Sequence, residues 1–161
     1  RARMKAVFIR SNTPACRLIR AIDGGAWSHC AIVLPDTNDG PAMCIEAAWP
    51  GGVRIRTLAG LLADRPDHLL VETGLPVPQA AASWLRRQVG AGYDWPALPA
   101  LAIRSVFGTA PLWAQPTRWY CAELLLAACA AGGAPISGPL RRYGVAAAFD
   151  HVRQVAAIHN T

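Results

Sequence analysis

The fold of this chain is decided by one stretch of its sequence, Trp119-Tyr120-Cys121-Ala122-Glu123-Leu124-Leu125-Leu126-Ala127-Ala128-Cys129-Ala130-Ala131-Gly132-Gly133. Alanine and leucine dominate the stretch and two glycines close it, which predicts a helix of about three turns. Cys121 falls in its first turn, where free N–H groups and the helix dipole favour a thiolate over a thiol. Cys129 lies in the middle of the helix and is expected to pack as a small apolar group.

A cysteine at such a position also has a second interpretation. Free thiols are among the most buried side chains in proteins, and most of them are inert parts of a core. Cys121 considered alone is therefore either a nucleophile or a packing group. The rest of the chain has to distinguish the two.

Length and composition favour one globular domain over residues 1–161. The hydrophobic content of 53% is high enough to form a single core and too high for a disordered chain. Sixteen basic residues against ten acidic ones give a net charge of +6. The basic residues are scattered in pairs such as Arg86-Arg87, so we expect a solvated basic surface with no nucleic-acid partner. Peripheral contact with a membrane is compatible with this charge.

The five cysteines indicate folding in a reducing compartment. Their number is odd, and neither a C-x-x-C pair nor the Cys/His spacing of a zinc site occurs, so no metal and no cofactor is expected. The N-terminal residues lack the apolar core of a signal peptide, and no apolar run is long enough to span a membrane. We therefore expect a protein that is cytoplasmic when made. Its oligomeric state and the origin of Arg1 to Arg3 stay open.

Strand-like and helix-like segments alternate along the chain, which favours an α+β fold. Strands are expected at residues 5–10, 27–34, 42–49, 53–57 and 68–72, forming a mostly antiparallel sheet with the hairpin of the second and third strands at its centre. Helices are expected at residues 14–22, 58–63, 78–89, 94–106, 119–133 and 144–157, with a loop over residues 107–118. Thr13-Pro14 marks the start of the first helix, and Asp94 is a candidate cap for the fourth.

The expected hairpin brings a histidine and a glutamate together. If it is symmetric about its turn-rich loop, His29 on the first strand lies directly opposite Glu46 on the second. Cross-strand neighbours have Cβ atoms about 5 Å apart, close enough for an imidazole–carboxylate hydrogen bond. A slip of one residue would place the two side chains on opposite faces, so the contact depends on the register.

Cys121, His29 and Glu46 are the three groups that a thiol enzyme of acyl transfer requires. The thiolate attacks, the imidazole carries the proton to the leaving group, and the polar residue orients the imidazole. In this sequence their order is histidine, glutamate, cysteine. Papain-like enzymes have the cysteine helix before the histidine strand, so the order here is that of a circular permutation.

Four segments resemble those of circularly permuted NlpC-type cysteine hydrolases, a papain-like superfamily that also includes lecithin:retinol-acyltransferase-like lipid enzymes. The segments are Trp27-Ser28-His29-Cys30-Ala31-Ile32, Cys44-Ile45-Glu46-Ala47, Gly92-Tyr93-Asp94 and Tyr120-Cys121-Ala122-Glu123-Leu124. The family has Ser-His-apolar, apolar-Glu-Ala, Gly-x-x-Tyr-Asp and Tyr-Cys-Ser-Glu-Leu at these places. The resemblance covers residues 5 to about 130. It departs at Ala122, where the family has serine, and after Gly133.

The resemblance implies a permuted papain-like domain in which the sheet packs against the cysteine helix. It implies Cys121 as the nucleophile, His29 as the base and acid, and Glu46 as the orienting group. The first candidate substrate is an amide bond of a peptidoglycan peptide, which would require delivery to the bacterial cell envelope by a phage or a secretion machine. The alternatives are a lipid esterase or acyltransferase with the same site, and a non-catalytic assembly module with a buried thiol.

Three aromatic residues are candidates for substrate binding. Tyr120 either lines the site, supplies a hydroxyl, or packs in the core. Trp95 and Trp113 flank a loop near the expected cleft and are candidates to shape an apolar channel. Glu123 lies about 200° around the helix from Cys121, so it is expected to point away from the thiol.

Overall fold

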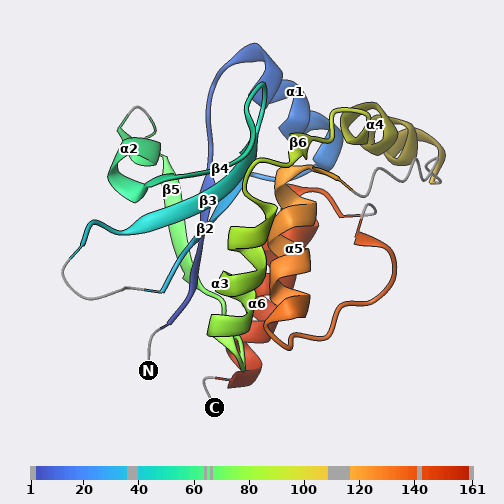
Figure 1. Ribbon diagram of the computed structural model, residues 1–161. Helices are drawn as coiled ribbons and strands as arrows, with labels where there is room; N and C mark the ends of the chain where they lie inside the picture. Colours follow the sequence, from blue (N-terminus) through green and yellow to red (C-terminus); the bar gives the residue numbers. More distant parts are fainter. Residues whose placement is uncertain are drawn as a thin grey trace.

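A computed structural model describes residues 3–35, 40–63, 65, 67–108, 117–140 and 143–159. Within these ranges the chain has an α+β fold, in which a five-stranded antiparallel sheet is packed against helices (Figure 1). The strands are β1 (Lys5–Ile9), β2 (His29–Val33), β3 (Met43–Ala48), β4 (Gly52–Thr57) and β5 (His68–Glu72). The helices are α1 (Pro14–Asp23), α2 (Leu58–Leu62), α3 (Pro78–Gln88), α4 (Ala97–Phe107), α5 (Cys121–Ala131) and α6 (Val145–His159). The predicted α+β class and antiparallel sheet are confirmed.

The order of the strands in the sheet is β4-β3-β2-β1-β5. The hairpin of β2 and β3 therefore lies inside the sheet, as predicted, with β4 and β1 on either side. The sheet places the N-terminus of β2, at His29, beside the end of β1 at Ile9. Among the described helices, none combines the length and the apolar character needed to cross a membrane.

Helix α5 forms the centre of the larger core. Every residue from Cys121 to Cys129 is buried, as expected for a helix in which Glu123 is the one charged residue. The helix contacts β2 and β3 on one side and packs against α3 and α6 on the other. Figure 1 shows α3, α5 and α6 together over one face of the sheet. The predicted packing of the cysteine helix on the sheet is confirmed.

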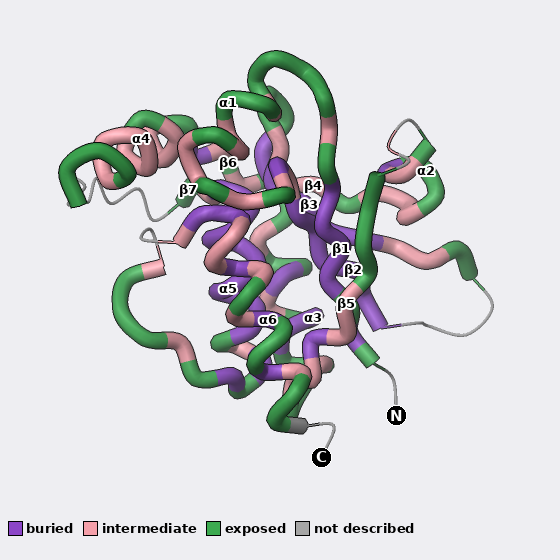
Figure 2. Tube along the Cα trace, turned by 180° about the vertical axis from the view of Figure 1, so that it is seen from behind, coloured by how far each residue is buried: buried purple, intermediate pink, exposed green. Residues whose placement is uncertain are grey.

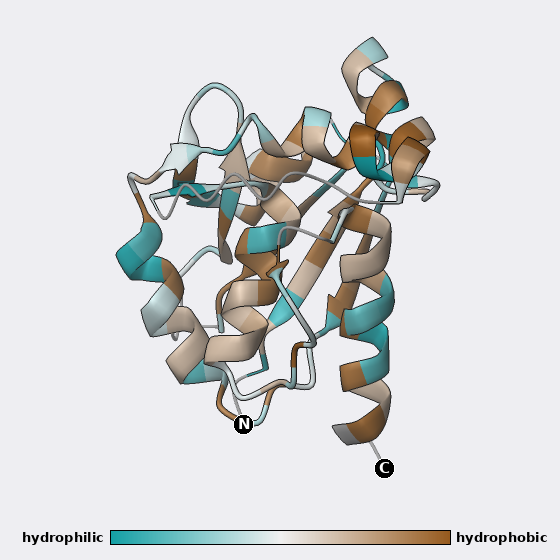
Figure 3. Ribbon diagram, turned by 90° about the vertical axis from the view of Figure 1, so that its right-hand side faces the viewer, coloured by the Kyte–Doolittle hydropathy of each residue, from teal (hydrophilic) through white to brown (hydrophobic). Residues whose placement is uncertain are grey.

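Helix α6 closes this core from outside. Val145, Ala148, Val152 and Val155 recur at helical spacing and are buried, whereas Arg153 is exposed. Figure 3 shows hydrophilic and hydrophobic residues side by side along this helix, which ends at the label C. A buried stripe and a solvated stripe of this kind are typical of a helix that covers a core.

The opposite face of the sheet carries a smaller apolar cluster. Val7, Ile9, Ala31, Val33 and Cys44 are buried there together with Leu61 of α2. Figure 2 shows that β1, β2 and β3 are mostly buried, whereas α1 and α4 are not. The central strands are thus covered on both faces. Polar residues on them require partners inside the protein.

Two features near α4 differ from the sequence prediction. Pro96 is the residue that precedes the helix, and no side chain caps it. Asp94 is fully buried, and its backbone carbonyl accepts a hydrogen bond from the Ala97 N–H. Asp94 is therefore not the side-chain cap that we expected, because the helix starts only after the proline.

The second difference is a short parallel ladder between β6 (Gly92–Tyr93) and β7 (Arg118–Trp119). Arg118 was expected in a loop and Trp119 in the helix, which begins only at Cys121. A ladder of two residue pairs is too short to produce a periodic pattern in the sequence. The ladder matters for the site because β7 leads directly into α5 and so fixes where that helix begins. It also brings Tyr93 opposite Trp119.

Gly52 allows β4 to approach the segment before β6. Its φ is 70°, and a Cβ atom there would lie 2.2 Å from the carbonyl oxygen of Ala91. That same oxygen accepts a hydrogen bond from the N–H of Val53 at 2.8 Å. The backbone of residues 91–92 cannot move away from a side chain without losing this bond.

We expect Gly52→Ala to lower the free energy of unfolding by more than about 2 kcal/mol, since the clash adds to the cost of the left-handed backbone. Gly90→Ala is the matched control, because Gly90 also has positive φ but no atom lies near its missing Cβ. That control should cost only about 1–2 kcal/mol. Urea denaturation of both variants measures the difference. Equal midpoints would contradict the proposed close approach at Gly52.

Candidate active site

Cys121 is the first residue of α5 and is 2% exposed. Tyr120 precedes it in extended backbone, so the chain turns into the helix at the thiol. The N–H of Tyr120 donates to the Glu123 carboxylate at 3.2 Å. Glu123 is buried, and its carboxylate satisfies a backbone N–H at the start of the helix. This is a structural role, in line with the expectation that Glu123 points away from the thiol.

His29 is the first residue of β2, and its side chain contacts Glu46 of β3. The distance between His29 Nε2 and Glu46 Oε2 is 2.6 Å. The His29 imidazole also forms a hydrogen bond with the Cys121 thiol. Because Nε2 faces the carboxylate, Nδ1 is the ring nitrogen left for the thiol. The structure thus brings together the three residues selected from the sequence.

The register behind this contact differs from the predicted one. Ile32 pairs with Ile45 and Val33 with Cys44, which places Ala31 rather than His29 opposite Glu46 when the ladder is continued. The prediction is therefore wrong by two residues along the strand. A displacement of two keeps both side chains on the same face, because side chains alternate with a period of two. His29 then reaches Glu46 along the diagonal.

Glu46 is completely buried and is surrounded by cations. Its Oε1 accepts a hydrogen bond from Arg54 Nε at 2.9 Å and lies 3.4 Å from Arg56. Arg65 approaches Oε2 at 3.9 Å. Arg54 is directly opposite Glu46 in the β3–β4 ladder. These contacts offset the free-energy cost of removing the carboxylate from water.

Each charged group of the site stabilises the charged form of its neighbour. Burial alone would raise the pKa of Glu46, but His29 and Arg54 outweigh it and lower that pKa to about 2. Burial alone would lower the pKa of His29, but hydrogen bonds with Cys121 and Glu46 raise it to about 9. The site therefore holds an imidazolium next to a carboxylate over the neutral pH range.

The same contacts favour the thiolate form of Cys121. Burial opposes its ionisation, but hydrogen bonds from Cys30 and His29 hold its pKa well below the ordinary value. For Cys129 in the same helix, burial raises the pKa to about 12. The surroundings of these two thiols thus move their pKa values in opposite directions.

Cys30 is a member of the site that the sequence did not single out. Burial and the adjacent Cys121 raise its pKa well above the ordinary value, so it stays a thiol and can donate to the thiolate. Its backbone N–H also donates to Cys121. In the sequence Cys30 looks like any apolar strand residue, because only the packing of β2 against α5 shows its position.

The aromatic candidates lie in different places. Tyr120 is buried, and among the described residues its hydroxyl has no hydrogen-bond partner. Tyr93 stacks edge-on against it with ring centroids 6.3 Å apart. Trp95 is 52% exposed and packs against Trp49, which is also exposed. The remaining candidate, Trp113, lies outside the described residues.

Two further residues near the thiol were not expected. Asp23 ends α1, and its carboxylate interacts electrostatically with Cys121. Tyr93 is also close enough for such an interaction. The Gly92-Tyr93-Asp94 segment was noted for its resemblance, but no role was assigned to the tyrosine. The sequence around Asp23 does not indicate a place in the site. Asp23 belongs to α1, and only the packing of the fold brings it near Cys121.

Within the described ranges, no group of three or more His, Cys, Asp or Glu side chains is placed to hold a metal ion. The chain was also compared with known proteins. No protein-family model matches it, and a search of curated proteins gave no match.

Replacing Cys30 with alanine removes a donor to the thiolate. We expect the pH midpoint for alkylation of Cys121 by iodoacetamide to rise by about one pH unit, because the charge-assisted bond is lost. Cys129→Ala removes a thiol from the same core without touching Cys121 and is the control. An unchanged midpoint in Cys30→Ala would mean that Cys30 only packs there.

Replacing Glu46 with glutamine removes the charge that favours the imidazolium. We expect kcat/KM to fall about 10²- to 10⁴-fold. We also expect the alkaline limb of the pH–rate profile to move from about 9 towards the ordinary histidine value of about 6.5.

The matched control for this prediction is Glu72→Gln, on the edge strand β5, where the carboxylate pairs with Arg3 at the surface. Circular dichroism verifies that both variants fold. An unchanged alkaline limb in Glu46→Gln would contradict an orienting role for Glu46.

Proposed function

We propose that this protein is a cysteine hydrolase that cleaves an acyl bond through a thioester intermediate. The observation that carries the proposal is the chain of contacts from Glu46 to His29 at 2.6 Å and from His29 to the Cys121 thiol at a helix start. A buried thiol used only for packing requires neither a cationic partner nor a buried carboxylate behind it.

In the first half of the reaction the Cys121 thiolate attacks the carbonyl carbon of the substrate. A C–S bond forms, and the carbonyl oxygen becomes an oxyanion. The tetrahedral species collapses as the bond to the leaving nitrogen or oxygen breaks, and the His29 imidazolium gives that atom its proton. The products of this half-reaction are a thioester on Cys121 and a free amine or alcohol.

In the second half, neutral His29 takes a proton from water as the water oxygen attacks the thioester. The C–S bond breaks, an acid leaves, and Cys121 returns as a thiolate beside the imidazolium. The oxyanion of both halves is placed near the backbone N–H of Cys121. That N–H belongs to the first helical turn, where N–H groups have no acceptor within the helix.

The fold supports a finer proposal, that of a circularly permuted papain-like domain. The base is on β2, the orienting carboxylate on β3, and the nucleophile on α5, which comes later in the chain. The spatial arrangement of a cysteine helix against a histidine strand does not depend on which of them comes first. The resemblance of the four sequence segments is the basis for choosing this superfamily.

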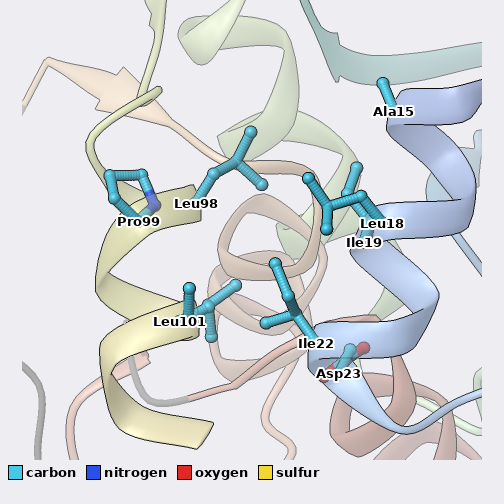
Figure 4. Close-up of a pocket in the computed structure, with 9 residues that line it drawn as sticks. Ala15, Leu18, Ile19, Ile22, Asp23, Leu98, Pro99 and Leu101 are labelled. Carbon is cyan, nitrogen blue, oxygen red and sulfur yellow. The ribbon is translucent and has the colours of Figure 1, made fainter. Parts of the chain in front are cut away.

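Two substrate classes remain candidates for this site. The resemblance favours an amide of a peptidoglycan peptide, and a lipid ester or thioester is the second candidate. One structural observation favours the second. An apolar groove between α1 and α4 has Asp23 in its lining (Figure 4), and the Asp23 carboxyl interacts electrostatically with Cys121.

We expect Cys121→Ala to abolish hydrolysis without unfolding the protein, and Cys129→Ala to retain it. Separate incubations with muropeptides and with phospholipid vesicles identify the substrate class by the products released. Fatty acid release that depends on Cys121 would establish the lipid candidate, and muropeptide cleavage would establish the amide. Full activity in Cys121→Ala would eliminate the proposed mechanism. Cleavage of neither substrate, together with slow labelling of Cys121 by iodoacetamide, would favour a non-catalytic module.

A further inference from the structure

A second thiol contacts the proposed nucleophile. Cys30 follows His29 on β2, and its thiol donates a hydrogen bond to the Cys121 thiolate. The backbone N–H of Cys30 donates to the same sulfur. Both cysteines are free and buried in the larger core, where β2 packs against α5. The sulfur atoms of Cys30 and Cys121 are therefore direct neighbours, and the proposed hydrolysis uses only one of them.

The other thiols of the chain lie elsewhere. Cys129 is separated from Cys121 by two turns of α5, a rise of about 12 Å along the helix axis. Cys44 belongs to the smaller apolar cluster on the opposite face of the sheet. Cys16 is on α1, which contributes no residue to either core cluster. Cys30 is thus the thiol that is placed to react with Cys121.

The contact between the two thiols suits a disulfide. In a disulfide the sulfur atoms lie about 2.05 Å apart, and the Cα atoms are usually about 4.4–6.8 Å apart. The hydrogen bond from the Cys30 N–H to the Cys121 sulfur shows that the start of α5 lies directly against the main chain of β2. Two thiols that already share a hydrogen bond approach bonding distance by rotation about their Cα–Cβ bonds.

We propose that Cys30 and Cys121 are a modification site, at which a hydroperoxide forms a reversible disulfide that blocks the nucleophile. The inference goes beyond the proposed function, because the bond forms whether or not a substrate is cleaved. The thiolate is the form of cysteine that reacts with hydroperoxides, and His29 stabilises it at Cys121. A stabilised thiolate is also a good leaving group, so a small dithiol reopens the disulfide.

The oxidation proceeds in two balanced steps. The Cys121 thiolate attacks one oxygen of hydrogen peroxide, the O–O bond breaks, and the leaving hydroxide takes the proton of the His29 imidazolium to become water. Cys121 is then a sulfenic acid, and the peroxide has been reduced. The Cys30 sulfur next attacks the Cys121 sulfur as the S–O bond breaks. The hydroxyl group leaves with the Cys30 proton as a second molecule of water, and the disulfide is complete.

The test oxidises the full chain with a small excess of hydrogen peroxide, alkylates the remaining thiols and maps the cysteines by mass spectrometry without reduction. Trypsin leaves Cys30 in the fragment 21–54 and Cys121 in the fragment 119–141. We expect these two fragments to be joined after oxidation and separate after treatment with dithiothreitol. Labelling of Cys121 by iodoacetamide should fall at least about tenfold on oxidation and return on reduction.

Each of the two fragments contains a second cysteine, Cys44 or Cys129. The double variant Cys44→Ala/Cys129→Ala is the matched control, because only Cys30 and Cys121 remain in it to join the fragments. It should form the same disulfide as the wild-type protein. Separate fragments in the oxidised wild-type protein, or a bond that is lost in this double variant, would overturn the inference.

Replacing Cys30 removes the partner of the sulfenic acid. Cys30→Ala and Cys30→Ser should give no joined fragments, and Cys121 should be oxidised further to the irreversible sulfinic acid. Circular dichroism verifies that the variants fold, and the serine variant keeps a side chain of similar size in the core. Joined fragments in either variant would also contradict the assignment of Cys30.

These measurements use no substrate and so separate this inference from the proposed function. If the disulfide forms but no substrate is hydrolysed, the modification site stands and the hydrolase proposal falls. If hydrolysis depends on Cys121 but the oxidised protein contains no bond to Cys30, the modification site falls and the hydrolase proposal stands. Where both hold, peroxide should lower kcat/KM at least about tenfold, and dithiothreitol should restore it in the wild-type protein but not in Cys30→Ala.

Discussion

The arrangement of the site depends on one carboxylate that has no access to water, that of Glu46. Glu46 lies on a central strand that is covered on both faces, and a buried charge without partners costs several kcal/mol. The sheet meets that cost by placing Arg54 directly across from it and His29 diagonally across from it. Removing any of these strands from the sheet would leave the carboxylate or its cations uncompensated. The same contacts hold the imidazole in one orientation.

The apolar helix α5 supplies the other half of the arrangement. Because all its residues except Glu123 are apolar, it packs inside the larger core, and its N-terminus then lies near the N-terminal end of β2. The ladder between β6 and β7 sets the point at which the helix begins. Thus a packing requirement brings the thiol to the imidazole, and the helix start and the neighbouring Cys30 then favour its ionised form.

Much of this could be predicted from local patterns. Alternating apolar residues, turn residues and glycines give every strand of the sheet and each of the six helices, with ends displaced by at most three residues. The choice of Cys121, His29 and Glu46 needed only their residue types, their elements and the resemblance. The register was wrong by two because a turn-rich loop does not fix its own symmetry. The contact between His29 and Glu46 is still formed, because a register shift of two residues keeps both side chains on the same face of the sheet.

The rest of the site could not be predicted, since it depends on contacts between distant parts of the chain. Arg54 and Arg56 are two residues apart on one strand and so share a face, but the sequence does not show that Glu46 lies beside that face. Cys30 and Asp23 gain their roles from the packing of α5 and α6. The groove unites helices whose sequences are far apart, and each of them alone is an ordinary amphipathic or apolar segment.

The most direct test of the account is the protonation state of His29. Nitrogen NMR of the intact protein, with His29→Gln to assign the signals, measures both ring nitrogens through a pH titration. The account predicts a doubly protonated ring at about pH 8 that loses a proton near pH 9. A ring that is neutral at about pH 8 and titrates near the ordinary value of about 6.5 would contradict it, because no imidazolium would then be available for Cys121.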